Sequence, residues 1–335
     1  MNTSAELLDV PTRIANFPFP FAKDSYRYST NVEPAGTPAR TAAGEWGKHT
    51  IEIDENYHHE LAERTRILAS DASRYQSLPH MMPAQWDAMI SIMRMLAESY
   101  PDSMSLERDG TAWIWRNGLL DTEQRFVVGD LGTLPIDPLR FATNQIQEDV
   151  VLLDQREGQL WGDAGVVTFA ADWSLRFDVG MSFLQIHGPV PRVHAEGVVS
   201  RAQSFLMRLE PGERYRRTNW TLTVDGKLDT STETYPQWGP DRTSLAQGPL
   251  EDVGDRLFLR VEVQHLIRLA TSGSIMFLIR SYLLPLRDIA SVPVWAQRLH
   301  AVLDDLPEDM ADYKGITKTR GPAMEWLRTH AGVDS

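Results

Sequence analysis

The sequence predicts an α+β protein in which mainly helical segments precede mainly β segments. Apolar residues recur at helical spacing in residues 84–100 and again in residues 294–306. Between these helices, from residue 148 onward, runs rich in Val, Ile, Leu and aromatic residues are separated by turn sequences, as expected for an antiparallel sheet. These observations divide the chain into an N-terminal arm and helical region over 1–147, a β-rich domain over 148–290, and a C-terminal helix with a tail over 291–335.

The N-terminal region is expected to begin with an extended arm. Residues 1–50 are rich in Pro, Ala, Thr and aromatic residues without a sustained period, so we expect them to pack over another surface. Residues 51–70 lack Gly and Pro and place acidic residues early and basic residues late, which suits a helix and its dipole. A second helix over 84–100 begins after Pro83 and stops at Pro101. A strand and a short helix are also expected in this region: 111–117 and 138–146.

The β-rich domain is expected to contain a hairpin, a helix and a three-stranded meander. Apolar runs around the turn-like sequences at Gly158 and Gly162 are typical of a hairpin. A helical pattern over 195–209 ends at Pro211. The three β segments of the meander follow: 213–225, 256–269 and 274–286. The amphipathic helix over 294–306 then closes the fold.

The charge and the hydrophobic pattern of the sequence argue against nucleic acid and membranes as partners. Forty-six acidic residues against 33 Lys and Arg give a formal net charge of -13, and that field would repel nucleic acid. No apolar stretch approaches the roughly 20 residues that span a bilayer, and the first residues lack the basic and apolar parts of a secretory signal. We therefore expect a cytoplasmic protein that binds neither nucleic acid nor a membrane.

The sequence contains no cysteine, which limits the metal chemistry of this chain. Disulfides, cysteine nucleophiles and thiolate-bound haem, iron-sulfur clusters or zinc are excluded, so a metal would be held by His or carboxylate side chains. The usual nucleotide-binding, zinc-protease, serine-hydrolase and kinase motifs are also missing. His58 and His59 do not form a metal motif, because adjacent helical residues diverge and a second His four residues on is missing.

Two histidines in a proline-containing segment are the first candidate metal ligands. Residues 183–194 read FLQIHGPVPRVH, so apolar residues precede His187 and two prolines fix the backbone before His194. A neutral imidazole in such a setting can bind a haem iron through one nitrogen while a hydrogen bond orients the other. The alternative is a core histidine bonded to a backbone carbonyl, and spacing alone leaves both interpretations open.

A second candidate site lies on the first strand of the meander. Arg217 and Asn219 alternate along it and share one face, while Trp220 points to the other face. Paired donors of this kind can polarise dioxygen or hold an anion, and Glu262 on the next strand can neutralise a cationic amine if it faces inward. The alternatives are a salt-bridged exterior strand and exposed cross-strand pairing.

Four motifs in combination resemble a known family. They are IHGPVP at 186–191, RTNW at 217–220, LRVEVQ at 259–264 and SGSIMFLIRSYLLPL at 272–286. With these motifs the chain resembles, over most of its length, the α subunit of haem-dependent oxidative N-demethylase. The resemblance implies that residues 148–290 form a PAS-like haem-binding domain, and the predicted hairpin, helix and meander agree with a PAS arrangement.

The resemblance also implies an activity. Enzymes of this kind oxidise dimethylamine with dioxygen to methylamine and formaldehyde, with electrons that come ultimately from NADPH. This chain would bind haem b and act as the oxygenase subunit, whereas FMN and the 2Fe-2S cluster would reside on flavin and iron-sulfur reductase subunits. Two alternatives stay open: a haem-based PAS gas sensor or ligand-binding module without turnover, and a structural subunit without a cofactor.

Cofactor-binding residues follow from the resemblance as well. His187 within IHGPVP is the first choice for the axial ligand of the haem iron, and His194 is the second. Trp220 and Arg280 complete the expected cofactor-binding set. Arginines such as Arg280 can anchor the haem propionates. The haem pocket would be lined by apolar residues: Trp173, Phe177, Met181, Phe183, Phe205, Phe277 and Ile279.

The expected catalytic residues are polar. Arg217 and Asn219 would form hydrogen bonds to dioxygen, and the carboxylate of Glu262 would hold the ammonium form of the substrate.

Overall fold

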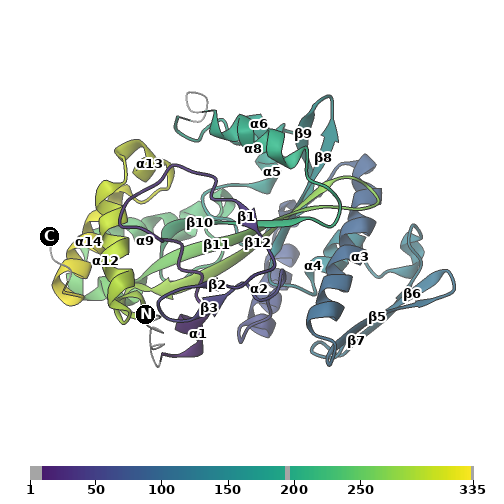
Figure 1. The fold of residues 1–335 in the computed structure, drawn as a ribbon, viewed down its shortest axis with the longest axis horizontal. Coiled ribbons are helices and arrows are strands. Elements are labelled where there is room, and N and C mark those ends of the chain that lie inside the picture. Colours follow the sequence, from purple (N-terminus) through teal and green to yellow (C-terminus); the bar gives the residue numbers. More distant parts are fainter. Residues whose placement is uncertain (1–9, 193–196, 333–335) are drawn as a thin grey trace, which may run out of the picture.

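The computed structural model describes residues 10–192 and 197–332 and contains a seven-stranded sheet surrounded by helices (Figure 1). The strand order is β1-β10-β11-β12-β8-β9-β4, and every neighbouring pair is antiparallel. The strands are β1 (Glu33–Pro34), β4 (Tyr75–Ser77), β8 (Asp149–Arg156), β9 (Gln159–Val166), β10 (Arg214–Val224), β11 (Leu257–Arg268) and β12 (Ile275–Pro285). The prediction of an α+β fold with an antiparallel sheet is confirmed.

The hairpin predicted after residue 148 is formed by β8 and β9. Glu157 and Gly158 join the strands with φ angles of 54° and 71°, as a tight hairpin turn with the right-handed strand twist requires. The second turn expected at Gly162 is wrong, because Gly162 lies within β9. The register instead slips at this point, so that Asp163, between Gly162 and Ala164, has no pairing partner on β8.

The meander predicted from the sequence is formed by β10, β11 and β12. Its register places Asn219 opposite Glu262, and Glu262 opposite Ser281. The connection from β10 to β11 includes α9 (Tyr235–Gln247), which the sequence did not predict because Pro240 lies inside the helix.

The five predicted helices are all present, with shifted ends. They are α2 (Tyr57–Ser70), α3 (Met82–Ser99), α4 (Pro138–Thr143), α8 (Val198–Leu206) and α12 (Pro293–Asp305). The helix expected over 51–70 begins only at Tyr57, because the backbone N–H groups of Ile53 and Asp54 donate instead to the side chains of Tyr100 and Gln147. Residues 195 and 196 of the helix expected over 195–209 lie outside the described residues.

The C-terminal region contains more than the single helix expected there. After α12 come α13 (Glu308–Tyr313) and α14 (Thr317–His330), and α14 contacts α12. Pro322 inside α14 and Gly315 just before it hid this helix from the sequence pattern. The last helix of the described chain is therefore α14 rather than α12.

The N-terminal region is not mostly helical, contrary to the expectation. A separate three-stranded sheet follows α3 and comprises β5 (Met104–Asp109), β6 (Ala112–Asn117) and β7 (Thr122–Phe126), of which only β6 was predicted. The arm adds a two-stranded sheet of β2 (Ala39–Arg40) and β3 (Glu45–Trp46). β1 and β4 belong to the N-terminal region and form the two edges of the main sheet.

The remaining elements are short. The α-helices among them are α1 (Thr12–Ala15), α5 (Leu175–Asp178), α6 (Phe183–Ile186), α10 (Val253–Arg256) and α11 (Leu286–Ala290). The 3-10 helices are η1 (Ala72–Arg74), η2 (Pro79–Met81), η3 (Leu131–Thr133), η4 (Thr232–Thr234) and η5 (Leu250–Asp252).

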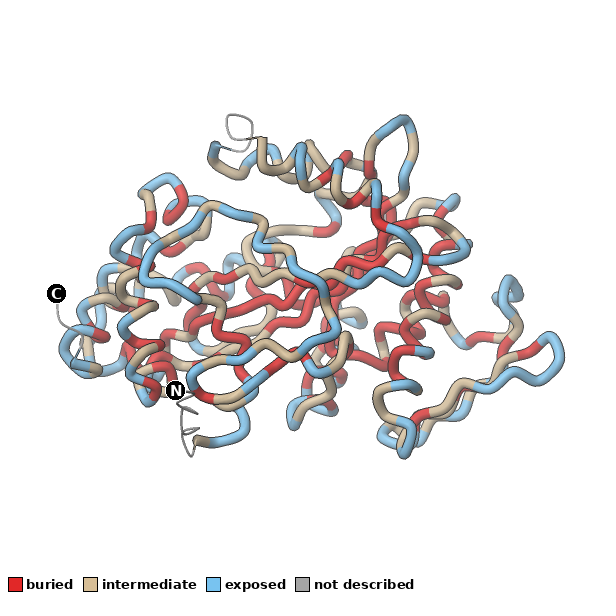
Figure 2. Tube along the Cα trace, in the orientation of Figure 1, coloured by how far each residue is buried: buried red, intermediate tan, exposed pale blue. Residues whose placement is uncertain are grey.

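The two faces of the main sheet carry different residues. Because side chains alternate along a strand, the register places Arg217, Asn219 and Glu262 on one face, named here the Arg217 face. Trp220 and Arg280 lie on the opposite face, named the Arg280 face. The Arg280 face carries two apolar clusters, one shared with α12 and α14 and the other with α3 and α4. Figure 2 shows the buried residues running along the central strands of the sheet.

The Arg217 face is covered differently. At the β8 and β9 end, α5, α6 and α8 contribute to a third apolar cluster with residues of the sheet, and Figure 1 shows α6 and α8 lying over this side. Toward β10, polar side chains replace the apolar ones, and several keep contact with solvent. This polar part of the Arg217 face is where the predicted site residues lie.

Candidate functional site

A connected group of polar side chains occupies the Arg217 face of β10 and β11. The Arg217 Nη1 donates to Gln264 Oε1 at 3.1 Å. Gln264 Nε2 and Asn219 Nδ2 donate to Glu262 Oε2 at 2.9 Å and 3.4 Å. The structure therefore brings together the three residues predicted as catalytic, Arg217, Asn219 and Glu262, on adjacent strands.

Glu262 is the negatively charged centre of this group. Its side chain is almost fully buried, with 6% of the residue exposed. Besides the two amide donors, it has Arg260 Nε 3.6 Å from its Oε1, and that nitrogen makes no hydrogen bond within the described part of the chain. A buried carboxylate requires such donors and charges, and it can hold a small cation presented to the same face.

Lys314, between α13 and α14, joins the group and was not predicted. Its Nζ donates to the backbone carbonyl of Trp220 at 2.8 Å and lies 3.5 Å from Asn219 Oδ1. The same Nζ is 4.6 Å from the centre of the Trp220 ring. The carbonyl oxygen of Lys314 accepts a hydrogen bond from Thr221 Oγ1 at 2.9 Å, which ties this loop to β10.

The surroundings lower the pKa of both cationic side chains of the site, Lys314 and Arg217. Burial, and then the charge of Arg217, lower the pKa of Lys314 to about 8, while Glu262 acts in the opposite direction. Burial also lowers the pKa of Arg217, again against Glu262. Both side chains nevertheless belong to partly exposed residues. Both side chains thus lose part of their hydration while the residues keep some contact with solvent.

His187 lies at the end of α6, over the same side of the sheet. Its Nδ1 is 2.8 Å from the carbonyl oxygen of Phe183, and the two rings are in contact with centroids 4.2 Å apart. Burial lowers the pKa of His187 and the charge of Arg217 adds to that effect, so the imidazole is neutral at neutral pH. With Nδ1–H donated to Phe183, the lone pair of Nε2 is unused among the described residues.

The second candidate ligand, His194, lies outside the described residues.

Trp220 and Arg280 lie on the Arg280 face, and of the two only Trp220 meets the group around Glu262, through its contacts with Lys314 Nζ. The Trp220 ring packs in an apolar cluster and meets Phe21 edge to face, with ring centroids 5.0 Å apart. Arg280 makes buried ion pairs with Glu60 (2.7 Å) and Asp54 (2.6 Å). The sequence correctly placed Trp220 opposite Arg217, but it gave no information on the face of Arg280, which depends on the β11–β12 register.

A cavity of about 570 Å³ lies beside Arg280 and is distinct from the site around Glu262. The arm, α2 and β12 contribute to its walls, which include Trp46, Glu60 and Tyr282. Because the buried charges in its wall, Arg280 and Glu60, are paired with each other and Arg280 also pairs with Asp54, we interpret it as a structural junction between the arm and the sheet.

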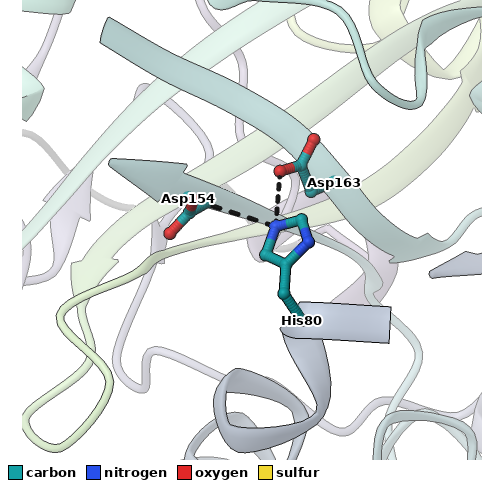
Figure 3. Close-up of side chains that lie close together, drawn as sticks. All are labelled: His80, Asp154 and Asp163. Atoms are coloured by element: carbon teal, nitrogen blue, oxygen red, sulfur yellow. Dashed lines mark hydrogen bonds and ion pairs between the residues drawn. The ribbon is translucent and has the colours of Figure 1, made fainter. Parts of the chain in front are cut away.

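A third group of titratable side chains lies at the β8–β9 hairpin (Figure 3). His80 Nε2 is 2.9 Å from Asp163 Oδ2 and 3.8 Å from Asp154 Oδ2, and such atoms can hold a metal ion. However, the Arg156 guanidinium forms ion pairs with both carboxylates. Since that cation already neutralises the two acids, we interpret this group as an ion-pair cluster rather than a metal centre.

The fold and the site define an α+β protein with a candidate cofactor-binding and small-ligand site on one face of an antiparallel sheet. Residues 42–324 match the family model described as haem-dependent oxidative N-demethylase, alpha subunit-like. The match covers most of the chain, so the protein belongs to this family, which is named for an oxidoreductase activity that depends on haem and for a subunit that implies other subunits. None of the described helices is both long and apolar enough to cross a bilayer.

The residues around His187 fit a haem. The free Nε2 of a neutral imidazole oriented by a backbone carbonyl is the donor that haem iron requires. Four of the aromatic residues expected in the pocket lie in or against the apolar cluster under α5, α6 and α8: Trp173, Phe183, Phe205 and Phe277. Phe177 is 71% exposed and does not join them. Arg217 supplies a cation near His187 that can pair with a propionate.

Proposed function

We propose that this chain is the haem-binding oxygenase subunit of a system that converts dimethylamine and dioxygen to methylamine and formaldehyde. The observation that carries the proposal is a neutral imidazole with a free Nε2, close enough to Arg217 to be affected by its charge, on the side of the sheet that carries a buried carboxylate, in a chain of this family. The imidazole suits a haem and the carboxylate suits an ammonium substrate, so one face of the sheet offers both requirements of a haem-dependent N-demethylation.

Each residue of the site has a distinct task in this proposal. His187 would hold the haem through Nε2, and the haem supplies the oxidising chemistry with dioxygen. Glu262 would orient the ammonium form of the amine, and the amides of Asn219 and Gln264 keep that carboxylate in place. Arg217, held by Gln264 and by the carbonyl of Thr30 (3.0 Å), would stabilise negative charge or donate a hydrogen bond at the same face.

A PAS-like domain over 148–290 is part of the proposal. If β8, β9, β10, β11 and β12 are numbered 1 to 5, their spatial order is 2-1-5-4-3, with α5, α6 and α8 in the connection between the second and third strands. This arrangement supports the PAS-like assignment that the sequence motifs imply. β1 and β4 would then be additions from the N-terminal region at the edges of that domain.

The electrons would come from partner subunits. A chain without cysteine cannot hold a 2Fe-2S cluster with thiolates, so the cluster is assigned to an iron-sulfur reductase subunit. FMN and the NADPH site are assigned to flavin and iron-sulfur reductase subunits because the family resemblance implies this division. We further propose that the complex works in the cytoplasm.

Turnover tests this function directly. The haem-loaded chain with a reductase partner and NADPH should form formaldehyde and methylamine in equal amounts from dimethylamine. Haem binding and gas binding without formaldehyde would contradict the proposal and support a haem-based sensor.

Replacing Glu262 with Gln tests the amine site. The variant keeps the shape of the side chain but loses its charge, so the KM for dimethylamine should rise by about tenfold to a hundredfold, the value of one charge-assisted hydrogen bond. The haem absorption spectrum without amine should stay unchanged. Glu308→Gln, which removes an exposed carboxylate paired with Arg320, is the matched control. An unaltered KM in Glu262→Gln would remove this residue from the amine site.

The negative charge of the chain predicts how an electron donor docks. At a net charge of -13, a partner with a basic surface would be attracted over roughly a Debye length. The second-order rate of electron transfer into this chain should therefore fall by about tenfold as salt is raised from low to high concentration. Stopped-flow reduction at a series of ionic strengths measures this, and a flat dependence would contradict docking through opposite charges.

A further inference from the structure

Lys314 is a nucleophile beside the proposed amine site that the proposed function does not use. Asn219 links the two, because its Nδ2 donates to Glu262 Oε2 while its Oδ1 lies 3.5 Å from Lys314 Nζ. The carbon released by oxidation of a methyl group, on an amine held by Glu262, would therefore appear close to the Lys314 amine, with only the Asn219 side chain linking the two positions. The product of that release is formaldehyde, which reacts readily with neutral primary amines.

The contacts of Nζ suit a neutral amine. A neutral lysine has two N–H donors and one lone pair, and the structure offers Nζ two acceptors, the Trp220 carbonyl at 2.8 Å and Asn219 Oδ1 at 3.5 Å. Both donors can be used while the lone pair stays available. Burial, and then the nearby charge of Arg217, favour the neutral form, whereas Glu262 and the face of the Trp220 ring favour the protonated one. The balance leaves the pKa of Lys314 at about 8, well below that of an ordinary lysine.

We propose that Lys314 captures formaldehyde covalently and reversibly at this site, an inference that rests on the proposed N-demethylation for the source of the aldehyde. The lone pair of Nζ forms a C–N bond to the formaldehyde carbon, and a proton moves from nitrogen to the new oxygen to give a carbinolamine. Loss of water then gives the imine, and addition of water reverses the sequence and releases formaldehyde. Each step conserves electrons, so no oxidant or reductant is needed. The captured aldehyde is kept from random reaction with other amines of the complex.

Reductive trapping tests the capture. The purified chain is treated near neutral pH with a small amount of formaldehyde and cyanoborohydride, which reduces an imine to a methylated amine, and the peptides are mapped by mass spectrometry. The chain has only five lysines to compare: Lys23, Lys48, Lys227, Lys314 and Lys318. Lys314 should be methylated about tenfold faster than each of the others, because a larger share of it is neutral. Methylation of Lys314 at the same rate as the others, or more slowly, would overturn the proposal.

Two variants and a turnover arm complete the test. Lys314→Arg should remove the fast labelling, whereas Lys318→Arg, which replaces an exposed lysine bonded to Thr243 Oγ1 at 2.8 Å, should leave it intact. Circular dichroism checks that both variants fold. The comparison of the five lysines within the wild-type chain does not depend on either variant. Because formaldehyde is added directly, fast labelling of Lys314 without amine turnover would contradict the N-demethylase function while supporting the capture. Amine turnover without fast labelling of Lys314 would support the N-demethylase function and contradict the capture.

Discussion

Replacement of His187 with Gly is expected to abolish the Soret band of the haem-reconstituted protein. The reason is that Nε2 of His187 is a free, neutral nitrogen on the candidate haem side of the sheet, and its Nδ1 is already fixed by the carbonyl of Phe183 at 2.8 Å. Loss of a hydrogen bond that supports a metal ligand lowers the affinity for the metal by roughly tenfold to hundredfold. Loss of the axial ligand itself should lower the affinity for haem by more than that. Absorption spectra of wild type and variant after haem titration measure the effect.

The controls separate ligation from folding. Free imidazole should restore a six-coordinate or five-coordinate haem spectrum in His187→Gly, because the vacated side-chain volume admits the small molecule. His59→Ala, which removes an exposed histidine of α2, should leave the Soret band unchanged. His194→Ala is measured in parallel. If His194→Ala loses the band and His187→Gly retains it, the axial ligand is His194 and the assignment of His187 is wrong.

The order of elements could be predicted from the sequence where one periodic pattern dominates. The helix over 84–100 has apolar residues at regular helical spacing with a proline at each end, and the structure has α3 at Met82–Ser99. Prolines hid the other helices, since α9 and α14 both contain one. In the hairpin, the sequence around Gly162 resembles a turn, yet the backbone continues as β9. Asp163 forms a bulge without a partner on β8, and the pairing of the two strands continues on both sides of it.

The candidate site could be predicted only in part, because its residues meet through tertiary packing. Arg217 and Asn219 share a face by alternation alone, which the sequence gives directly. That Glu262 lies opposite Asn219 depends on strand register, which no local pattern fixes. Lys314 gave no signal, since it follows a short helix far along the chain from β10, and tertiary contacts with Asn219, Trp220 and Thr221 bring it to the site. The register between β11 and β12 puts Arg280 on the other face, because Glu262 lies opposite Ser281 and not opposite Arg280.

Replacement of Arg280 with Met is expected to destabilise the fold by about 3–5 kcal/mol, the cost of leaving buried carboxylates without their cation. Arg280 is 2% exposed, and its guanidinium pairs with Glu60 at 2.7 Å and Asp54 at 2.6 Å. Glu148 is also buried: burial raises its pKa to about 7, and the charge of Arg280 is the main opposing influence. Urea unfolding of variant and wild type gives the difference in the free energy of unfolding.

The pH dependence of this loss identifies its cause. Burial already raises the pKa of both Glu60 and Glu148 in the folded state, and removing Arg280 raises both further. A carboxyl group whose pKa is higher in the folded than in the unfolded state costs no stability below its unfolded pKa, and the folded state is weakened as pH rises toward the folded pKa. The destabilisation by Arg280→Met should thus be small near pH 4 to 5, grow as pH rises through the folded pKa values of Glu60 and Glu148 in the wild type, and reach its full size only above their higher values in the variant.

A matched surface pair supplies the control for Arg280→Met. Arg256 contacts Asp225 at 2.8 Å, with about a third of each side chain exposed, so Arg256→Met should cost less than about 1 kcal/mol at either pH. A loss in Arg280→Met as small as that of the control would mean that Glu60 and Glu148 find other partners. If Arg280→Met kept full stability but altered the haem spectrum, Arg280 would return to the cofactor site in which the sequence motifs had placed it. The expected result is a large, pH-dependent loss of stability with an unaltered Soret band, because the ion pairs of Arg280 lie on the face of the sheet opposite to His187 and Glu262.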